Sequence, residues 1–345
     1  MNRKDEHIKL SLLQTEQHND FDNVRFVHNA INDCNIETID LTTSYANYHF
    51  PLPIYINAMT GGTIKAKEIN KTLALLANKF KIPMASGSMA ILLKNQEAFA
   101  SFQVIKENNR DGVFIANIGA DQEWKSIKKI IDWFKPNILQ IHLNIPQELI
   151  MKEGNKDFRK IENNIKEIMK NVDIPVIVKE VGFGMSRKTM SKLKELGVKT
   201  IDVGGKGGTN FIKIENERRE KGLEYLNLYG LSTVESLLEA TTIPNLEILA
   251  SGGIRNPFDA IKALSLGAKA IGMAKYFLKL VTDNSIDDAI FKFNEFIEEL
   301  KIIMTMLGVK NVSELQELEL IFSPSLESFL RQRNISYEVF IKRKR

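Results

Sequence analysis

The sequence contains very little cysteine and histidine. Among its 345 residues there is one cysteine, Cys34, and there are five histidines. A single thiol excludes a disulfide framework within the chain and a metal site built on several cysteines. A zinc site needs three or four His, Cys or carboxylate ligands, and the chain has no H-x-x-x-H pair. This usage of cysteine fits a reducing cytoplasm.

The chain also lacks an excess of one charge and any long apolar run. Its 47 basic and 43 acidic residues give a net charge of +4, which is too balanced to indicate a nucleic-acid partner. No apolar run reaches the roughly 18 residues that a membrane span needs, and the first residues are charged, unlike a signal peptide. We therefore expect a soluble cytoplasmic protein with no nucleic-acid partner and no membrane insertion.

Short apolar runs alternate with longer stretches of helical spacing over most of the chain. Runs rich in Ile, Val and Ala are typical of buried parallel strands, and helix-like sequence follows each of them. The clearest helices are expected over 65–80 and 186–197, the second ending at Gly197. The eight expected strands are 53–59, 82–88, 112–119, 138–144, 175–182, 200–205, 246–253 and 268–274.

Eight consecutive strand–helix units predict an α/β fold, a (β/α)₈ TIM barrel. The alternative is an open doubly wound sheet, whose dinucleotide-binding form carries its glycine fingerprint after the first strand, whereas here glycine-rich turns follow late strands. We expect one barrel domain over 51–345 that ends in helices over 276–306 and 311–333. A long polar insertion spans 206–230, and an N-terminal extension, 1–50, shows few helix or strand signals.

Polar residues stand at the same end of every expected strand. In a TIM barrel the active site lies at the C-terminal ends of the strands, so these side chains are candidate site residues. Lys179, inside an apolar run, needs an anionic partner. It is a base, a Schiff-base lysine, a contact to an electron-rich ring, or a lysine paired with a nearby carboxylate. The other candidates are Thr60, Ser86, Ser88, Asn117, His142, Asn144, Gln147 and Glu148.

Three late turns are rich in glycine: GGKGGT (204–209), SGGIR (251–255) and GMAK (272–275). Phosphate often binds after strands seven and eight of such barrels, where glycine lets backbone N–H groups approach its oxygens. Glycine used for tight turns alone is the other interpretation. Asn256 and Pro257 are expected to start a helix whose N-terminus faces the anion.

Glu148 and the N-terminal stretch RKDEHI (3–8) each leave two interpretations open. A lone carboxylate suits an open Mg²⁺ site completed by substrate phosphate and water, or it complements a helix N-terminus. RKDEHI is either a frayed tail or part of a site that closes over an anion.

In combination and order, seven motifs resemble those of the type 2, flavin-dependent isopentenyl-diphosphate delta-isomerase family. The resemblance covers nearly the whole chain. Its motifs are RKDEHI (3–8), AMTGG (58–62), GSM (87–89), HLNxxQE (142–148), VKEVGFG (178–184), GGKGGTNF (204–211) and SGGIR (251–255). It implies a barrel that holds FMN and interconverts isopentenyl diphosphate and dimethylallyl diphosphate in isoprenoid biosynthesis. It also implies Mg²⁺, NADPH as the reductant of FMN, and a homotetramer or homo-octamer.

The resemblance assigns roles to individual residues. Gln147, His142 and Lys179 would be catalytic, and Glu148 would bind Mg²⁺. The substrate would contact Arg3, Lys4, His7, Ser88, Met89, Ala90, Asn144 and Gln147. FMN would contact Ala58, Met59, Thr60, Ser88, Asn117, Lys179, Thr209, Gly253, Ile254, Arg255, Ala274 and Lys275.

Three other functions share parts of this pattern. A flavin-dependent α-hydroxy-acid oxidase or dehydrogenase needs a histidine base on a late strand, and no histidine follows His142. An enzyme similar to inosine-monophosphate dehydrogenase needs a cysteine nucleophile after the sixth strand, where GGKGGTNF has none. A catalytically dead scaffold would have lost site groups, and the flavin-contacting positions show no such loss.

Overall fold

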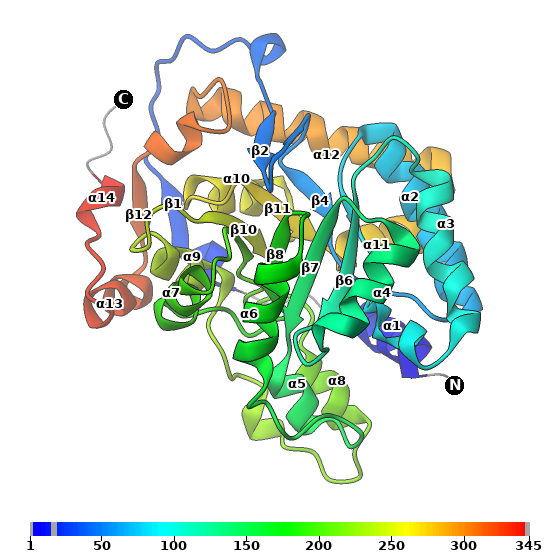
Figure 1. Cartoon of the computed structure of the whole chain (residues 1–345). Helices are drawn as coiled ribbons and strands as arrows, with labels where there is room; N and C mark the ends of the chain where they lie inside the picture. The colour runs from blue at the N-terminus through cyan, green and yellow to red at the C-terminus, as the bar shows by residue number, and fades with distance from the viewer. Residues whose placement is uncertain (1–2, 15–18, 342–345) are drawn as a thin grey trace.

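Eight parallel strands close into a barrel in the computed structural model, which describes residues 3–14 and 19–341 (Figure 1). Each strand pairs with its neighbours in sequence, and β11 pairs with β4 to close the circle. The predicted TIM barrel is therefore confirmed and the open sheet is excluded. The barrel strands are β4 (Ile54–Ile56), β5 (Met84–Ala85), β6 (Phe114–Gly119), β7 (Ile138–Leu143), β8 (Val176–Glu180), β9 (Thr200–Asp202), β10 (Glu247–Ser251) and β11 (Ala270–Met273).

Helices surround the barrel because each carries an apolar face that packs against the strands. The two clearest helix predictions are confirmed. The helix expected over 65–80 is α2, and the helix expected over 186–197 is α7, which Gly197 follows with a positive φ of 94°. The helices between and after the barrel strands are α2 (Ile64–Phe80), α3 (Ala100–Asn108), α4 (Trp124–Phe134), α5 (Ile145–Ile150), α6 (Ile161–Asn171), α7 (Arg187–Glu195), α8 (Phe211–Glu217), α9 (Thr233–Ala240), α10 (Pro257–Ser265), α11 (Lys275–Thr282) and α12 (Ile286–Leu307).

The segment before the barrel has more regular structure than its sequence indicated. It forms helix α1 (Arg3–Leu13), strand β1 (Val24–Phe26) and a hairpin of β2 (Thr43–Tyr45) and β3 (Tyr48–Phe50). The sequence carries few signals for these elements because α1 begins with a run of polar residues. Its stability comes from contacts with the rest of the molecule.

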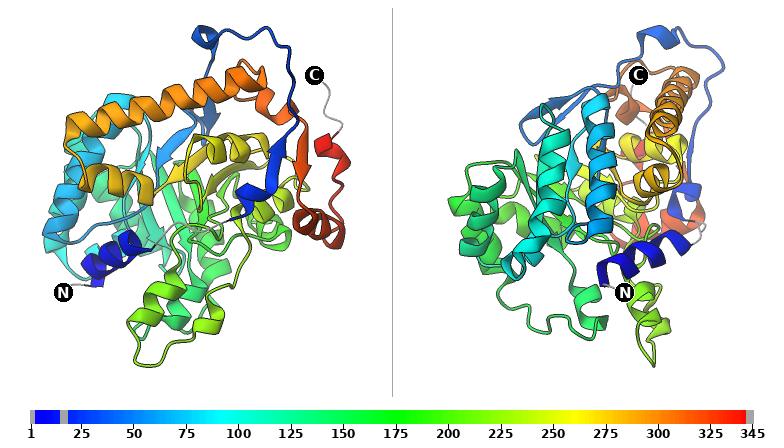
Figure 2. Two further views of the ribbon diagram at one scale, coloured as in Figure 1. Left: turned by 180° about the vertical axis from the view of Figure 1, so that it is seen from behind. Right: turned by 90° about the vertical axis from the view of Figure 1, so that its right-hand side faces the viewer.

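The C-terminal part returns to the N-terminal extension. Strand β12 (Leu320–Phe322) pairs antiparallel with β1, beside α13 (Pro324–Gln332) and α14 (Glu338–Ile341), so a C-terminal strand lies against the N-terminal extension (Figure 1). The insertion over 206–230 carries α8, which packs on α5 where both project from one end of the barrel (Figures 1 and 2). Within the described residues, no helix is long and apolar enough to cross a membrane.

Candidate functional site

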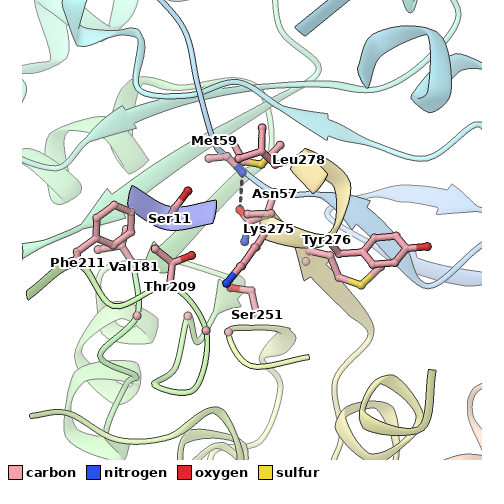
Figure 3. Close-up of a pocket in the computed structure, with 18 of the residues that line it drawn as sticks. Ser11, Asn57, Met59, Val181, Thr209, Phe211, Ser251, Lys275, Tyr276 and Leu278 are labelled. Atoms are coloured by element: carbon pink, nitrogen blue, oxygen red, sulfur yellow. Dashed lines mark hydrogen bonds between the residues drawn. The ribbon is translucent and has the colours of Figure 1, made fainter. Parts of the chain in front are cut away.

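A cavity of about 570 Å³ opens at the C-terminal ends of the barrel strands. Its wall takes residues from the ends of all eight strands and from α1, and its volume lies within the range of small-molecule sites, roughly 300–1,000 Å³. Figure 3 shows Ser11 of α1 in this cavity near Thr209 and Phe211, with Val181 beside the Phe211 ring. The cavity therefore lies at the end of the barrel where the sequence predicted the active site.

Most of the predicted site residues line this cavity. Three do not: Met89 is buried in the hydrophobic core, Ala90 packs against that core, and Ser86 is buried, where it accepts a hydrogen bond from the Asn117 N–H. Arg3 belongs to α1, but its side chain lies outside the described part of the structure. Those on the wall are Lys4, His7, Ala58, Met59, Thr60, Ser88, Asn117, His142, Asn144, Gln147, Glu148, Lys179, Thr209, Gly253, Ile254, Arg255, Ala274 and Lys275.

Lys179 lies buried at the end of β8, next to Asp202 on the paired strand β9. Burial lowers the pKa of Lys179, and the negative charges of Asp202 and Glu180 oppose that effect. The Lys179 ammonium donates a hydrogen bond to the Glu180 carbonyl at 2.6 Å. Lys179 is thus a buried amine beside two carboxyl groups, with its side chain on the cavity wall.

Asp202 is a fully buried carboxylate that connects several strands beneath the cavity. It accepts hydrogen bonds from the Tyr55 hydroxyl at 2.5 Å and from the Asn57 amide at 3.0 Å. The Ser251 hydroxyl, 2.7 Å away, and the Gly204 N–H, 3.1 Å away, also donate to it. A buried charge is tolerated only when it is bonded in this way, so Asp202 fixes β4, β9 and β10 relative to one another.

His142 lies half-buried at the end of β7, on the cavity wall. Burial lowers the pKa of His142 to about 3, and the positive charges of Lys179 and Lys4 add to the effect. Its Nδ1 lies 3.2 Å from Asn117 Oδ1, an acceptor, so Nδ1 carries the ring proton and Nε2 is left as an acceptor. His142 is therefore a neutral, oriented imidazole at neutral pH.

The glycine turns after β9 and β10 pack against each other at the cavity wall. A Cβ on Gly252 would lie 2.0 Å from the Gly205 carbonyl oxygen, and a Cβ on Gly208 would lie 2.9 Å from the Gly253 nitrogen. Gly252 and Gly253 also have positive φ angles of 96° and 76°. Only glycine allows so close an approach, which leaves a concave backbone surface of the kind that holds a phosphate.

Arg255 and Asn256 lie at this glycine surface but use their side chains within the protein. The Arg255 guanidinium bonds to Asp22 at 2.5 Å and to Asp259 at 2.7 Å. The Asn256 side chain accepts a hydrogen bond from the Asp259 N–H and caps α10, as expected from the sequence. The Arg255 charge is thus already paired with two carboxylates.

Residues 4–7 of α1 lie over the mouth of the same barrel, and each of these four has a partner there. Lys4 donates to the Ser88 carbonyl at 3.2 Å, and Asp5 accepts from the Thr63 hydroxyl at 2.8 Å. Glu6 accepts from Arg218 at 3.1 Å, and His7 Nε2 lies 3.0 Å from a Glu215 oxygen. The described part of RKDEHI is therefore a folded part of the rim.

Glu148 stands in the first turn of α5, at the edge of the cavity. Its two oxygens accept hydrogen bonds from the Asn144 amide at 2.9 Å and from the Asn155 N–H at 2.7 Å. A carboxylate has about four acceptor positions, so each oxygen keeps one for a cation. No group of three His, Cys, Asp or Glu within the described residues could hold a metal ion. The residues thus suit Mg²⁺ only if substrate phosphate and water complete its ligands.

The cavity also offers groups that suit a flavin. The hydroxyl of Thr60 is buried on the cavity wall without a hydrogen-bond partner among the described residues. A buried donor of this kind needs an acceptor from a ligand or from water. Together with the glycine surface and buried Lys179, it fits a ligand with a polar ring and a phosphate.

Three polar residues at this end of the barrel did not emerge from the sequence: Asp202, Glu215 and Arg218. An acid inside the apolar run TIDVGG was a usable signal for Asp202, because a buried carboxylate needs partners. Glu215 and Arg218 are three residues apart, a spacing that places two side chains on one helix face. That signal was lost because the polar insertion 206–230 was not expected to contain a helix.

Solved structures support the fold. The chain is similar to the recombinant flavin-binding domain of baker's yeast flavocytochrome b2, with a TM-score of 0.66 and 18% identity over 95% of this chain and 84% of that one. It is also similar to a mandelate oxidase variant with benzaldehyde, with a TM-score of 0.65 and 14% identity over 92% and 94% of the chains. Identities this low establish the fold alone.

Two sequence comparisons identify the family. Residues 142–321 match the family model described as FMN-dependent dehydrogenase. Isopentenyl-diphosphate delta-isomerases from Staphylococcus aureus, strains Mu3 and Newman, are 45% identical to this chain over 337 residues, which cover 97% of this chain and 97% of each relative. An identity at this level across the barrel, the N-terminal extension and the cavity shows common descent, and the chain belongs to the isopentenyl-diphosphate delta-isomerase family.

Proposed function

We propose that this protein interconverts isopentenyl diphosphate and dimethylallyl diphosphate with FMN as its cofactor. The observation that carries the proposal is the position of α1, which brings Lys4 and His7 to the rim of a cavity lined by glycine turns and Lys179. A diphosphate needs cations, and a flavin phosphate needs a backbone cradle. The family membership and the match to an FMN-dependent model support both parts of this assignment.

The reaction moves a double bond by one carbon, so one carbon gains a proton and a neighbouring carbon loses one. Reduced FMN supplies this difficult proton transfer when it is bound, without net oxidation or reduction of the substrate. The protein binds and orients the reactants. Gly253, Ile254, Arg255, Ala274 and Lys275 would surround the flavin phosphate, and Ala58, Met59, Thr60, Ser88, Asn117 and Thr209 would line the rest of its site.

Lys179 and Gln147 have separate roles in this proposal. Lys179 is a buried amine, and in its protonated form it would stabilise negative charge on a ring placed against it. Gln147 Nε2 lies 3.4 Å from a Glu215 oxygen, which holds the amide at the cavity wall where it would orient the alkene. His142, which is neutral at physiological pH, would accept a hydrogen bond from a bound ligand at its Nε2.

The N-terminal extension, 1–50, would form part of the substrate site. Arg3, Lys4 and His7 would bind the diphosphate from α1, and Ser88 and Asn144 would approach the substrate from the barrel. Met89 and Ala90, whose side chains face the core, would contact it only through their backbone. Closure of α1 over the cavity would also keep water away from the cation-like carbon that forms as the proton is added.

Mg²⁺, NADPH and assembly complete the proposal. Mg²⁺ would bind Glu148 and the substrate diphosphate, and NADPH would reduce FMN without being consumed in each turnover. We also propose a homotetramer or homo-octamer in the cytoplasm.

Glu148→Gln should raise the Mg²⁺ concentration needed for half-maximal activity by about tenfold or more, since it removes the carboxylate charge. An unchanged Mg²⁺ titration would remove Glu148 as a ligand.

The central test is anaerobic incubation of the purified protein with isopentenyl diphosphate, FMN, Mg²⁺ and dithionite, followed by analysis of the products. Dimethylallyl diphosphate should form, and the protein should release FMN on denaturation. If NADPH is instead oxidised stoichiometrically with a keto-acid substrate, the chain is a dehydrogenase. The absence of histidine after His142 argues against that outcome, because such chemistry needs a base.

A further inference from the structure

One arginine beside the cavity joins three separate segments of the chain. Arg218, directly after α8, bonds to Glu6 of α1 at 3.1 Å and to Glu153, between α5 and α6, at 2.9 Å. It also pairs with Glu215 on α8. Each segment ends at the rim of the cavity, yet Arg218 does not line the cavity itself. Its contribution must therefore pass through its partners.

Glu215 connects Arg218 to two residues of the cavity wall. Its side chain is 1% exposed, and one of its oxygens faces Arg218. The other oxygen lies 3.0 Å from His7 Nε2 and 3.4 Å from Gln147 Nε2. Burial tends to raise the pKa of Glu215, but the contacts with His7 and Arg218 outweigh it and leave the pKa below its usual value. The carboxylate is thus ionised while it bridges α8, α1 and α5.

Helix α1 depends on such polar contacts because it buries little apolar surface. Ile8 is its one fully buried residue within the described positions, whereas Lys4, Asp5, Glu6 and His7 all contact other segments through polar groups. Without Arg218, the carboxylates of Glu6, Glu153 and Glu215 would lose the guanidinium that they share. Their mutual repulsion would push α1 and the Glu153 loop away from α8.

We propose that Arg218 is a positioning residue for the reaction: it ties α1 and the α5–α6 loop to α8, so that Lys4, His7 and Gln147 close over the substrate as one unit. The planar guanidinium suits this role because its three nitrogens each face a different carboxylate, whereas a lysine has one nitrogen for all three. The catalytic part of the inference rests on the proposed isomerase function. The structural part, the attachment of α1, does not.

The test compares Arg218→Gln with Arg333→Gln. Arg333 pairs at 2.6 Å with Glu239, whose side chain is 0% exposed, and neither residue lines the cavity. Both variants therefore leave a buried carboxylate without its guanidinium, but only the first affects α1. Amide hydrogen exchange over residues 3–13 should become at least about tenfold faster in Arg218→Gln and stay unchanged in Arg333→Gln. Equal exchange in the two variants would overturn the proposal.

Kinetics test the second half of the inference. Arg218→Gln should raise the KM for isopentenyl diphosphate by about tenfold or more, with a smaller fall in kcat and an FMN Kd within about twofold of the native value. Arg218→Lys should restore only part of the loss. Because the exchange experiment needs no substrate, an inactive native protein would refute the isomerase assignment and leave the attachment of α1 to be decided separately. A loss of kcat and FMN binding with an unchanged KM would contradict the positioning role.

Combining Arg218→Gln with Glu6→Gln tests whether Arg218 holds α1 through Glu6. If Arg218 holds α1 through Glu6, the double variant should exchange α1 amides no faster than Arg218→Gln alone. If the effects of the two substitutions simply multiply, the two residues act independently and the attachment through Glu6 is wrong.

Discussion

His142 is a histidine that the fold keeps uncharged. Desolvation at the end of β7 lowers the pKa of His142 to about 3, and Lys179 and Lys4 supply further positive charge nearby. In the unfolded chain the same imidazole has an ordinary pKa near 6.5. Below that pH the unfolded state binds a proton that the folded state does not, so stability is complete at neutral pH and falls as the pH drops toward 3.

A comparison of the native protein with His142→Gln measures this effect. Between pH 7 and pH 5 the FMN-free native protein should lose about 2 kcal/mol more unfolding free energy than the variant, because only the native chain gains a proton on unfolding at that position. Urea denaturation at a series of pH values gives both curves. Parallel curves would mean that His142 titrates normally in the folded protein and is accessible to water.

At the residue scale, sequence reasoning succeeded where a strand end carried a lone polar group. His142, Asn117 and Lys179 were identified in this way, and all three line the cavity. It could not find what those side chains bond to, because partners such as Asp202 come from distant parts of the chain. Asp202, whose negative charge acts on Lys179, is an example: it lies opposite Lys179 because β8 and β9 are adjacent in the barrel.

At the scale of elements, α1 shows how a polar helix takes its place from its partners. Lys4 of α1 lines the cavity and reaches the Ser88 carbonyl, while Lys9 of the same helix is exposed and does not line the cavity. The two lysines thus provide a matched pair of positions. They share one helix and one chemistry, and they differ in whether the charge faces the site.

Lys4→Ala should raise the KM for isopentenyl diphosphate by about 10- to 100-fold, since a hydrogen bond to a charged group contributes about 1.5–3 kcal/mol. FMN should remain bound, because Lys4 lies on the α1 side of the cavity. Lys9→Ala should leave both quantities unchanged, which steady-state kinetics and flavin fluorescence would show. An equal effect of the two substitutions would mean that α1 contributes only general positive charge.

The turns after β9 and β10 give a second prediction at this scale. Gly252 has φ 96° and faces the Gly205 carbonyl, whereas Gly267 has φ 107° with nothing within 4 Å of its Cβ position. Alanine strains both backbones alike, but only Gly252→Ala also drives a methyl group into a neighbouring turn. Gly252→Ala should therefore weaken FMN binding at least about tenfold more than Gly267→Ala, since overpacking costs about 1–3 kcal/mol. Equal FMN affinities in a fluorescence titration would show that the two turns do not form the cradle.

The elements that could be predicted are those whose own sequence carries a period. The buried strands appear as apolar runs, and helices such as α2 and α7 show helical spacing, so their places agree with the expected ranges. Helices α1 and α8 lack that signal because polar contacts with each other and with neighbouring segments hold them. The rim of the site is built from these two helices, so the sequence predicted the barrel more fully than the rim.

At the scale of the whole molecule, the N-terminal extension and the C-terminal strand β12 together support the glycine turn after β10. Strand β1 pairs with β12, and the residues just before β1 contact that turn and α10. The Asn19 amide donates to the Gly253 carbonyl at 2.8 Å, and Lys262 donates to the Phe21 carbonyl at 2.7 Å. A C-terminal strand thereby helps to hold the segment that packs beside the proposed flavin phosphate site.

Two neighbouring residues of β12 test this long-range support. Leu320 is fully buried and pairs with Phe26, whereas Ile321 is 39% exposed and pairs with Arg25. Leu320→Ala should destabilise the protein by about 2–5 kcal/mol, and Ile321→Ala should cost much less because its side chain leaves a smaller cavity. Because β12 holds β1, Leu320→Ala should also raise the FMN Kd. Thermal unfolding measures the stability, and flavin titration measures the FMN affinity. A large loss of stability with unchanged FMN affinity would show that the contacts of Asn19 and Asp22 hold the turn without help from the C-terminal strand.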